Sequence, residues 1–171
     1  MNQQQQRLVQ IIQKIEIFKG LNMDEVRQIL QVCKMRNFAP NELVYKAEAP
    51  SDEMLILLKG QLMITSASGE PLGSVISGNP IGEMGVFTGH PRSATVTAAT
   101  DAGGIAIRKM DVEIMLSRNP GMYVKVLKNM VTILSGRLAQ ANAQNEQHMR
   151  TIMRMRDLME QRSHSTSEEE K

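Results

Sequence analysis

The sequence predicts an α+β domain in which a sandwich or barrel of short strands lies between helical segments. Two observations carry this prediction. Between residues 42 and 108, short apolar stretches follow one another about every 8–12 residues, separated by turn-forming residues. Before and after that region, apolar residues recur at the three- and four-residue spacing of a helix. Strands spaced in this way favour a sandwich or barrel over alternating strand–helix units.

Size and composition fit one soluble domain with an appendage. The chain has 171 residues, 42% of them hydrophobic, with no Trp and 14 Met, so the core must be mainly aliphatic. A net charge of +2 gives no argument for nucleic acid as a partner. The single cysteine rules out an internal disulfide, and no apolar run is long enough for a signal peptide or a membrane span. We therefore expect a cytoplasmic protein that does not contact a membrane.

The chain is predicted to begin with helices. Apolar residues at Leu8, Ile12 and Ile15 predict an amphipathic helix over residues 8–18, after a glutamine-rich start. Asn22 and Glu25 have the spacing of a capping box, which predicts the start of a second helix.

Short apolar stretches then predict a series of strands. They lie at residues 43–45, 54–58, 61–66, 72–76, 94–99 and 104–107. Proline, glycine, asparagine and serine residues separate most of them, as expected for tight turns.

The C-terminal part returns to a helical pattern. Residues 110–116 predict a short helix, and Asn119 followed by Pro120 predicts the cap and first residue of a long one that runs to about residue 162. Two apolar rows repeat every seven residues along it: Leu127, Leu134, Ala141, His148 and Met155, and Val131, Leu138, Asn145, Ile152 and Met159. This heptad pattern predicts a coiled coil, most simply a homodimer, in which the polar seam residues Asn145 and His148 help to set the register.

Residues 81–96 concentrate features of an anion-binding site. Gly82, Gly85 and Gly89 allow close approach of the backbone to a ligand, and Arg92 offers a rigid fork of donors to a phosphate. Backbone amides of a short helical turn, together with those of Ser93 and Ala94, would supply further donors. Glu83 would be repelled by phosphate, so a sugar hydroxyl is its natural partner. On these residues alone, a mutual Glu83–Arg92 ion pair on a loop remains an alternative.

The sequences Gly-Glu-Met-Gly-Val-Phe from Gly82 and Pro-Arg-Ser-Ala-Thr-Val from Pro91 closely resemble the phosphate-binding cassette of the cyclic nucleotide-binding domain family. Residues 17–21, 38–45, 51–60 and 118–120 also resemble family segments in the same order, so the resemblance covers about residues 15–140. It implies a β-roll, which is a jelly-roll-like double-stranded β-helix, flanked by N-terminal helices and a long C-terminal dimerisation helix. One departure is Ala-Glu-Ala at residues 47–49, where many members have a glycine.

The resemblance also implies roles for individual residues. Glu83 would accept a hydrogen bond from the ribose 2′-hydroxyl, and Arg92 would pair with the cyclic phosphate. The amides near Gly82, Met84, Gly85, Ser93 and Ala94 would complete the phosphate cradle. Leu72, Val75, Ile81 and Val96 would line the base and sugar pocket, and Arg137 and Asn142 on the long helix are candidates for reading the base. Serine after the arginine, as in bacterial activators, favours cAMP over cGMP as the ligand.

These predictions divide the chain into an N-terminal helix (1–20), a nucleotide-binding β-roll with flanking helices (21–118), a long coiled-coil-like helix (119–162) and a disordered tail (163–171). The winged helix-turn-helix of transcription factors in this family does not follow the long helix. We therefore expect no DNA-binding domain, and a sensor whose helix moves on ligand binding and signals to a separate effector protein.

Other functions are less favoured by the sequence. It contains no cofactor motif, metal-ligand cluster, P-loop or nucleophile elbow, so we expect a protein that is not an enzyme and holds no metal. A structural adaptor with a vestigial nucleotide pocket is the main alternative. Nucleic-acid binding through the basic helix is a weaker one.

Overall fold

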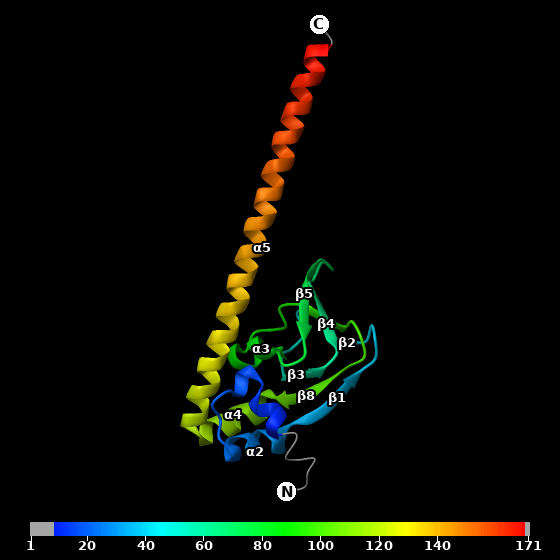
Figure 1. Ribbon diagram of the computed structural model, residues 1–171. Helices are drawn as coiled ribbons and strands as arrows, with labels where there is room; N and C mark the ends of the chain where they lie inside the picture. Colours follow the sequence, from blue (N-terminus) through cyan, green and yellow to red (C-terminus); the bar gives the residue numbers. More distant parts are fainter. Residues whose placement is uncertain (1–8, 170–171) are drawn as a thin grey trace. The chain divides into compact units, whose positions relative to one another are not determined.

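The computed structural model describes the backbone of residues 9–169, with the side chains up to Arg156 and those of Leu158 and Met159. The glutamine-rich start of the chain lies outside the described residues. The chain divides into two compact units, one ending at Met130 and the other beginning at Val131. The first unit holds the helices α2 (Met23–Val32), α3 (Glu83–Thr88) and α4 (Lys109–Arg118), the strands of the described residues, and the beginning of α5 (Pro120–Glu169) (Figure 1).

The first unit is built on two four-stranded antiparallel sheets. One has the order β1-β8-β3-β6 and the other β2-β7-β4-β5. The strands are β1 (Lys34–Phe38), β2 (Leu43–Tyr45), β3 (Glu53–Lys59), β4 (Gln61–Thr65), β5 (Pro71–Ile76), β6 (Pro80–Ile81), β7 (Thr95–Ala98) and β8 (Ala102–Arg108). This arrangement, with its flanking helices, confirms the predicted α+β β-roll.

The core lies among side chains from both sheets. Its cluster of buried residues contains Phe38, Tyr45, Leu55, Leu57, Leu62, Val75, Ile81, Val96, Ala98, Ala102 and Ala106. Strand β3 is buried along Met54–Leu57 without the alternation of a half-exposed strand. Helix α3 (Glu83–Thr88) contacts β3, and α4 (Lys109–Arg118) contacts β8, so both helices pack against strands of this sheet.

The first predicted helix differs from the structure. Helical backbone continues only to Gln13, and a 3₁₀ turn, η1, follows at Glu16–Phe18. Ile15 and Ile17 are both buried. Residues two apart point to opposite sides of an α-helix, so a continuous helix with one face on the core would bury only one of them. The break at Lys14 lets both side chains enter the core.

Two strands were not predicted. β1 begins directly after helix α2 (Met23–Val32), and four of its five residues are exposed. It carries no apolar alternation because it is an edge strand that pairs only with β8. β6 has two residues, Pro80 and Ile81, and is defined by its pairing with β3.

The predicted helix starts agree with the structure. Asn22 and Glu25 form the capping box of α2, with the Glu25 amide 2.9 Å from Asn22 Oδ1 and the Asn22 amide 2.7 Å from Glu25 Oε2. Helix α5 (Pro120–Glu169) begins at the predicted proline, and the Met122 amide donates to Asn119 Oδ1 at 3.1 Å.

The C-terminal end of α5 and the division of the chain into units differ from the prediction. Met122, Val126 and Met130 are buried, so the start of α5 belongs with the β-roll unit and the division falls at Met130, not at residue 118. The helix also continues past residue 162 to Glu169, since no proline or glycine interrupts it after Gly136. The predicted disordered tail therefore begins as helix, and its residues 170–171 lie outside the described residues. None of the described helices combines the length and the apolar character needed to cross a membrane.

Candidate functional site

The site is centred on the short helix α3, which lies between two glycines in the left-handed conformation. Gly82 and Gly89, its caps, both have φ of 78°. Other residues rarely adopt this conformation, so the glycines allow the chain to turn sharply into and out of the helix. Glu83 is the first residue of α3 and is 1% exposed. The predicted helical turn after residue 83 is confirmed.

Arg92 is buried beside the start of this helix. Only 7% of the residue is exposed, and its Nη1 donates to the Gly82 carbonyl at 3.1 Å. Its Nη2 lies 3.7 Å from a carboxylate oxygen of Asp52, whose side chain is 87% exposed. Its Cζ lies 3.6 Å from the centre of the Tyr45 ring. A guanidinium has five N–H donors, more than these contacts require.

Steric fit explains why glycine stands at residues 82 and 85. A Cβ on Gly82 would collide with Nη1 of Arg92 and press on the Tyr45 ring. A Cβ on Gly85 would collide with the side chain of Ser51 and the His90 carbonyl. The start of α3 is therefore packed closely against Arg92 and Tyr45 on one side of Gly82, and against Ser51 and the His90 backbone at Gly85.

The loop between β2 and β3 holds the backbone of Arg92. The Glu48 amide donates to the Arg92 carbonyl at 2.8 Å, and the Arg92 amide donates to the Ala49 carbonyl at 2.9 Å. Glu48 has a φ of 65°, which is unusual for a residue with a side chain. Within the Ala-Glu-Ala segment at residues 47–49, Glu48 therefore takes a left-handed conformation.

The other predicted cradle and lining residues fall into two groups. Val75, Ile81 and Val96 belong to the buried core cluster. Ser93, Met84 and Leu72 are exposed, and Leu72 is 56% exposed on β5. Ala94 is half-buried. The roles assigned to these residues toward a nucleotide remain predictions.

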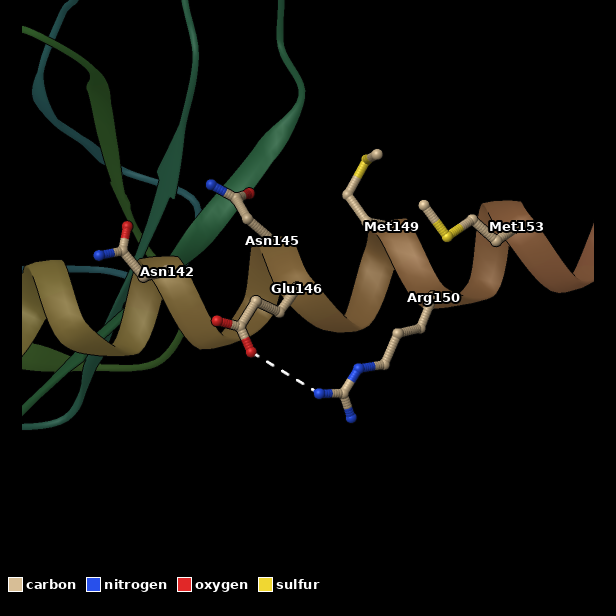
Figure 2. A pocket seen from close by; sticks show the side chains of 6 residues that line it. All are labelled: Asn142, Asn145, Glu146, Met149, Arg150 and Met153. Carbon is tan, nitrogen blue, oxygen red and sulfur yellow. Dashed lines mark ion pairs between the residues drawn. The ribbon is translucent and has the colours of Figure 1, made fainter.

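The two candidate base-reading residues, Arg137 and Asn142, lie on α5 in the second unit. Asn142 borders a shallow depression of about 530 Å³ on that helix, lined by Asn142, Asn145, Glu146, Met149, Arg150 and Met153. Figure 2 shows Glu146 and Arg150 beside each other, with 3.8 Å between a carboxylate oxygen and Nη2. All six residues come from one helix, so the depression is an open surface and does not enclose a ligand. The contact of Arg137 and Asn142 with a base stays a prediction.

Sequence reasoning missed the residues that surround Arg92 from the β2–β3 region. Tyr45, Ser51 and Asp52 approach α3 and Arg92 only through folding. The local sequence predicts a strand at Tyr45, but nothing in that pattern indicates that its ring lies against an arginine far along the chain.

Comparison with known proteins agrees with this geometry. Residues 35–119 match the family model described as the cyclic nucleotide-binding domain, and the match includes both sheets and the segment from Gly82 to Arg92. The chain belongs to the cyclic nucleotide-binding domain family. This family is regulatory and not catalytic. The predicted family is therefore confirmed.

Cyclic nucleotide-binding domains of known structure share the fold. One from Methylobacillus flagellatus is 24% identical, with a TM-score of 0.69 over 80% of this chain and 79% of that one. The catabolite activator protein of Thermus thermophilus is 22% identical, with a TM-score of 0.64 over 77% of this chain and 62% of that one.

Curated relatives are longer proteins. A cyclic nucleotide-gated potassium channel of Mesorhizobium japonicum is 25% identical over 65% of this chain and 30% of its own length. Glutaminase 1 of Bradyrhizobium diazoefficiens is 26% identical over 74% of this chain and 21% of its own length. The chain thus spans less than a third of either relative, and the similarity concerns the binding domain.

Proposed function

We propose that the β-roll binds a cyclic nucleotide through Glu83 and Arg92 and acts as a sensor. The observation that carries the proposal is the burial of both side chains at the start of α3, with the Arg92 guanidinium against Gly82. A buried guanidinium favours an anion that accepts several hydrogen bonds, and a phosphate has that chemistry. A buried carboxylate suits a hydroxyl donor, such as that of a ribose. One acid and one guanidinium within ten residues support a ligand that carries both groups.

We propose cAMP as the preferred ligand over cGMP, and the cytoplasm as the place of binding. Ser93 after the phosphate-binding arginine supports cAMP through the resemblance to bacterial activators. Ser93 is exposed, so its hydroxyl can donate to an added ligand without rearrangement of the core. Affinities for the two nucleotides test this preference directly.

A thermal-shift titration with cAMP and cGMP tests binding. A ligand at 100 times its Kd adds about 2.7 kcal/mol to the free energy of unfolding. Arg92→Ala should weaken binding by about 2–5 kcal/mol because it removes a buried charge partner of the phosphate. If neither nucleotide shifts the melting temperature at millimolar concentration, the proposed ligand is wrong. A folded protein that binds neither nucleotide would instead fit the alternative of a structural adaptor with a vestigial pocket.

We also propose that ligand binding changes the position of α5 and that this change is read by an effector protein. Strand β8 runs directly into α4, and only Asn119 separates α4 from α5. This short connection supports transmission of a movement at the β-roll to the helix. Amide hydrogen exchange tests this coupling. Binding of cAMP should change the exchange protection of residues 109–130 as well as that of the cassette at residues 82–96. A change confined to the cassette would contradict the coupling.

Self-association through α5 completes the proposal. The seam residues Val131, Leu138, Ile152, Met155 and Met159 are each more than half exposed in the single chain. Apolar side chains repeated at heptad spacing and exposed to water favour pairing with a second copy of the same helix. Sedimentation equilibrium should therefore find a dimer.

A further inference from the structure

The guanidinium of Arg92 lies directly over the aromatic ring of Tyr45. The guanidinium carbon lies 3.6 Å from the centre of the ring, which places the cation against the face of the aromatic system. A Cβ added to Gly82 would lie 3.0 Å from Cε2 of the same ring, and the Gly82 carbonyl accepts from Arg92 Nη1. Tyr45 and Arg92 are both more than nine-tenths buried. The ring and the carbonyl therefore restrain the guanidinium from two sides.

The hydroxyl of Tyr45 has no part in this arrangement. Among the described residues it has no hydrogen-bond partner, although it is buried. Burial raises the pKa of this hydroxyl above its ordinary value, and the charge of the neighbouring Glu53 carboxylate raises it further. The contact with Arg92 is thus made by the ring, and phenylalanine would preserve it.

We propose that Tyr45 is a positioning residue for the phosphate-binding arginine. Its ring holds the planar guanidinium flat against one face, so that the donor edge is oriented before the ligand arrives. An arginine side chain loses considerable rotamer freedom when it binds an anion, and a guanidinium that is already ordered loses less. This inference rests on the proposed function, since it assigns the ring a part in nucleotide affinity.

The core offers a matched control. Phe38 belongs to the same buried cluster as Tyr45, and the guanidinium of Arg36 lies 5.5 Å from the centre of its ring. Replacement of Phe38 by leucine removes a buried aromatic ring under an arginine that has no predicted role in the site. It should lower stability as Tyr45→Leu does and leave nucleotide affinity unchanged.

Calorimetric titration with cAMP compares the variants. Tyr45→Leu should bind about tenfold more weakly than wild type, as expected for loss of a desolvated cation–π contact. Tyr45→Phe and Phe38→Leu should stay within about twofold of wild type, because neither loses the ring that contacts Arg92. In an Arg92→Lys background, which lacks the planar guanidinium, Tyr45→Leu should have little further effect. Equal affinity of Tyr45→Leu and wild type would overturn the proposal, and so would an equal loss in Tyr45→Phe and Tyr45→Leu.

An NMR measurement on the ligand-free protein separates this inference from the proposed function. The Arg92 Nε–Hε resonance should be shifted by the ring current of Tyr45 in wild type and in Tyr45→Phe, and should lose that shift in Tyr45→Leu. If wild type binds no cyclic nucleotide, the proposed function fails, whereas this resonance still decides whether Tyr45 orders Arg92. A resonance unchanged by Tyr45→Leu would refute the positioning role whether or not a nucleotide binds.

Discussion

Lys125 on α5 donates hydrogen bonds to both carboxylate oxygens of Glu25 on α2, at 3.0 and 2.9 Å. Glu25 also accepts from the Asn22 amide in the capping box, and its side chain is 7% exposed. One carboxylate therefore joins the cap of α2 to the beginning of α5. Close by, Asn129 donates to the carbonyls of Ile17 and Lys19 at 3.0 and 2.8 Å. These contacts fix the start of α5 within the β-roll unit.

Lys125→Met should destabilise the protein by about 1–3 kcal/mol, because it leaves a largely buried carboxylate without its cationic partner. The cost is smaller than for a fully buried pair, because the Lys125 side chain is 40% exposed and water screens its charge. Urea unfolding measures the change. Arg27→Met is the control: Arg27 pairs with Asp24 on the same helix, but both side chains are at least half exposed. Its effect should stay within about 0.5 kcal/mol, and an equal effect of the two variants would contradict the role of Glu25.

The same pair should make stability depend on pH. Burial alone would raise the pKa of Glu25, but the hydrogen bonds from Lys125 and Asn22 and the charge of Lys125 hold it below its ordinary value of 4.5. A group whose pKa is lower in the folded protein than in the unfolded chain stabilises the fold at pH values above its unfolded pKa. This stabilisation is lost as the pH falls through the folded pKa. The stability difference between wild type and Glu25→Gln should therefore shrink between pH 7 and pH 3. A constant difference would show that the carboxylate charge is not responsible.

Glu48→Gly should stabilise the protein by up to about 1 kcal/mol. Glycine removes the cost of a left-handed residue with a Cβ, which is about 1–2 kcal/mol, and part of the gain is offset by the freedom of glycine in the unfolded chain. Glu48→Ala is the matched control, since it removes the carboxylate and keeps the Cβ. Thermal unfolding should separate the two variants. Equal stabilities would mean that the conformation of residue 48 costs nothing.

Gly82→Ala should damage both stability and nucleotide binding. A Cβ at this position collides with the Arg92 guanidinium, in addition to the strain of a φ of 78°. Gly69→Ala separates these causes, because Gly69 has a φ of 90° and nothing lies within 4 Å of its added Cβ. We expect Gly69→Ala to cost about 1–2 kcal/mol of stability with no change in affinity. Gly82→Ala should cost more stability and weaken cAMP binding, and retention of full affinity would show that Arg92 does not need this space.

Asn145→Leu should tighten self-association at least about tenfold, because it replaces a polar seam residue by an apolar one that a second helix can cover. Gln147 is two residues away and exposed, and it points to the opposite side of the helix. Gln147→Leu should therefore leave the dissociation constant unchanged. Sedimentation equilibrium of both variants measures it, and an equal response would place the interface elsewhere on α5.

The sequence alone determined the features that depend on neighbouring residues. The capping box of α2 and the Asn119–Pro120 start of α5 each involve side chains within three residues of the helix end they stabilise. Apolar strands such as β3 and β4, and the short helix α3 between its glycines, could be predicted for the same reason. Their physical cause is local, so their pattern is visible in the chain.

Only the tertiary structure decided the features that depend on distant partners. The exposed edge strand β1 is defined by its pairing with β8, and the break before η1 by the need to bury Ile15 and Ile17 together. The position of Tyr45 under Arg92 is of the same kind. The sequence indicated that Arg92 is suited to phosphate. The fold determined what holds its guanidinium in place, because a ring on β2 and an arginine before β7 meet only when the two strands pair.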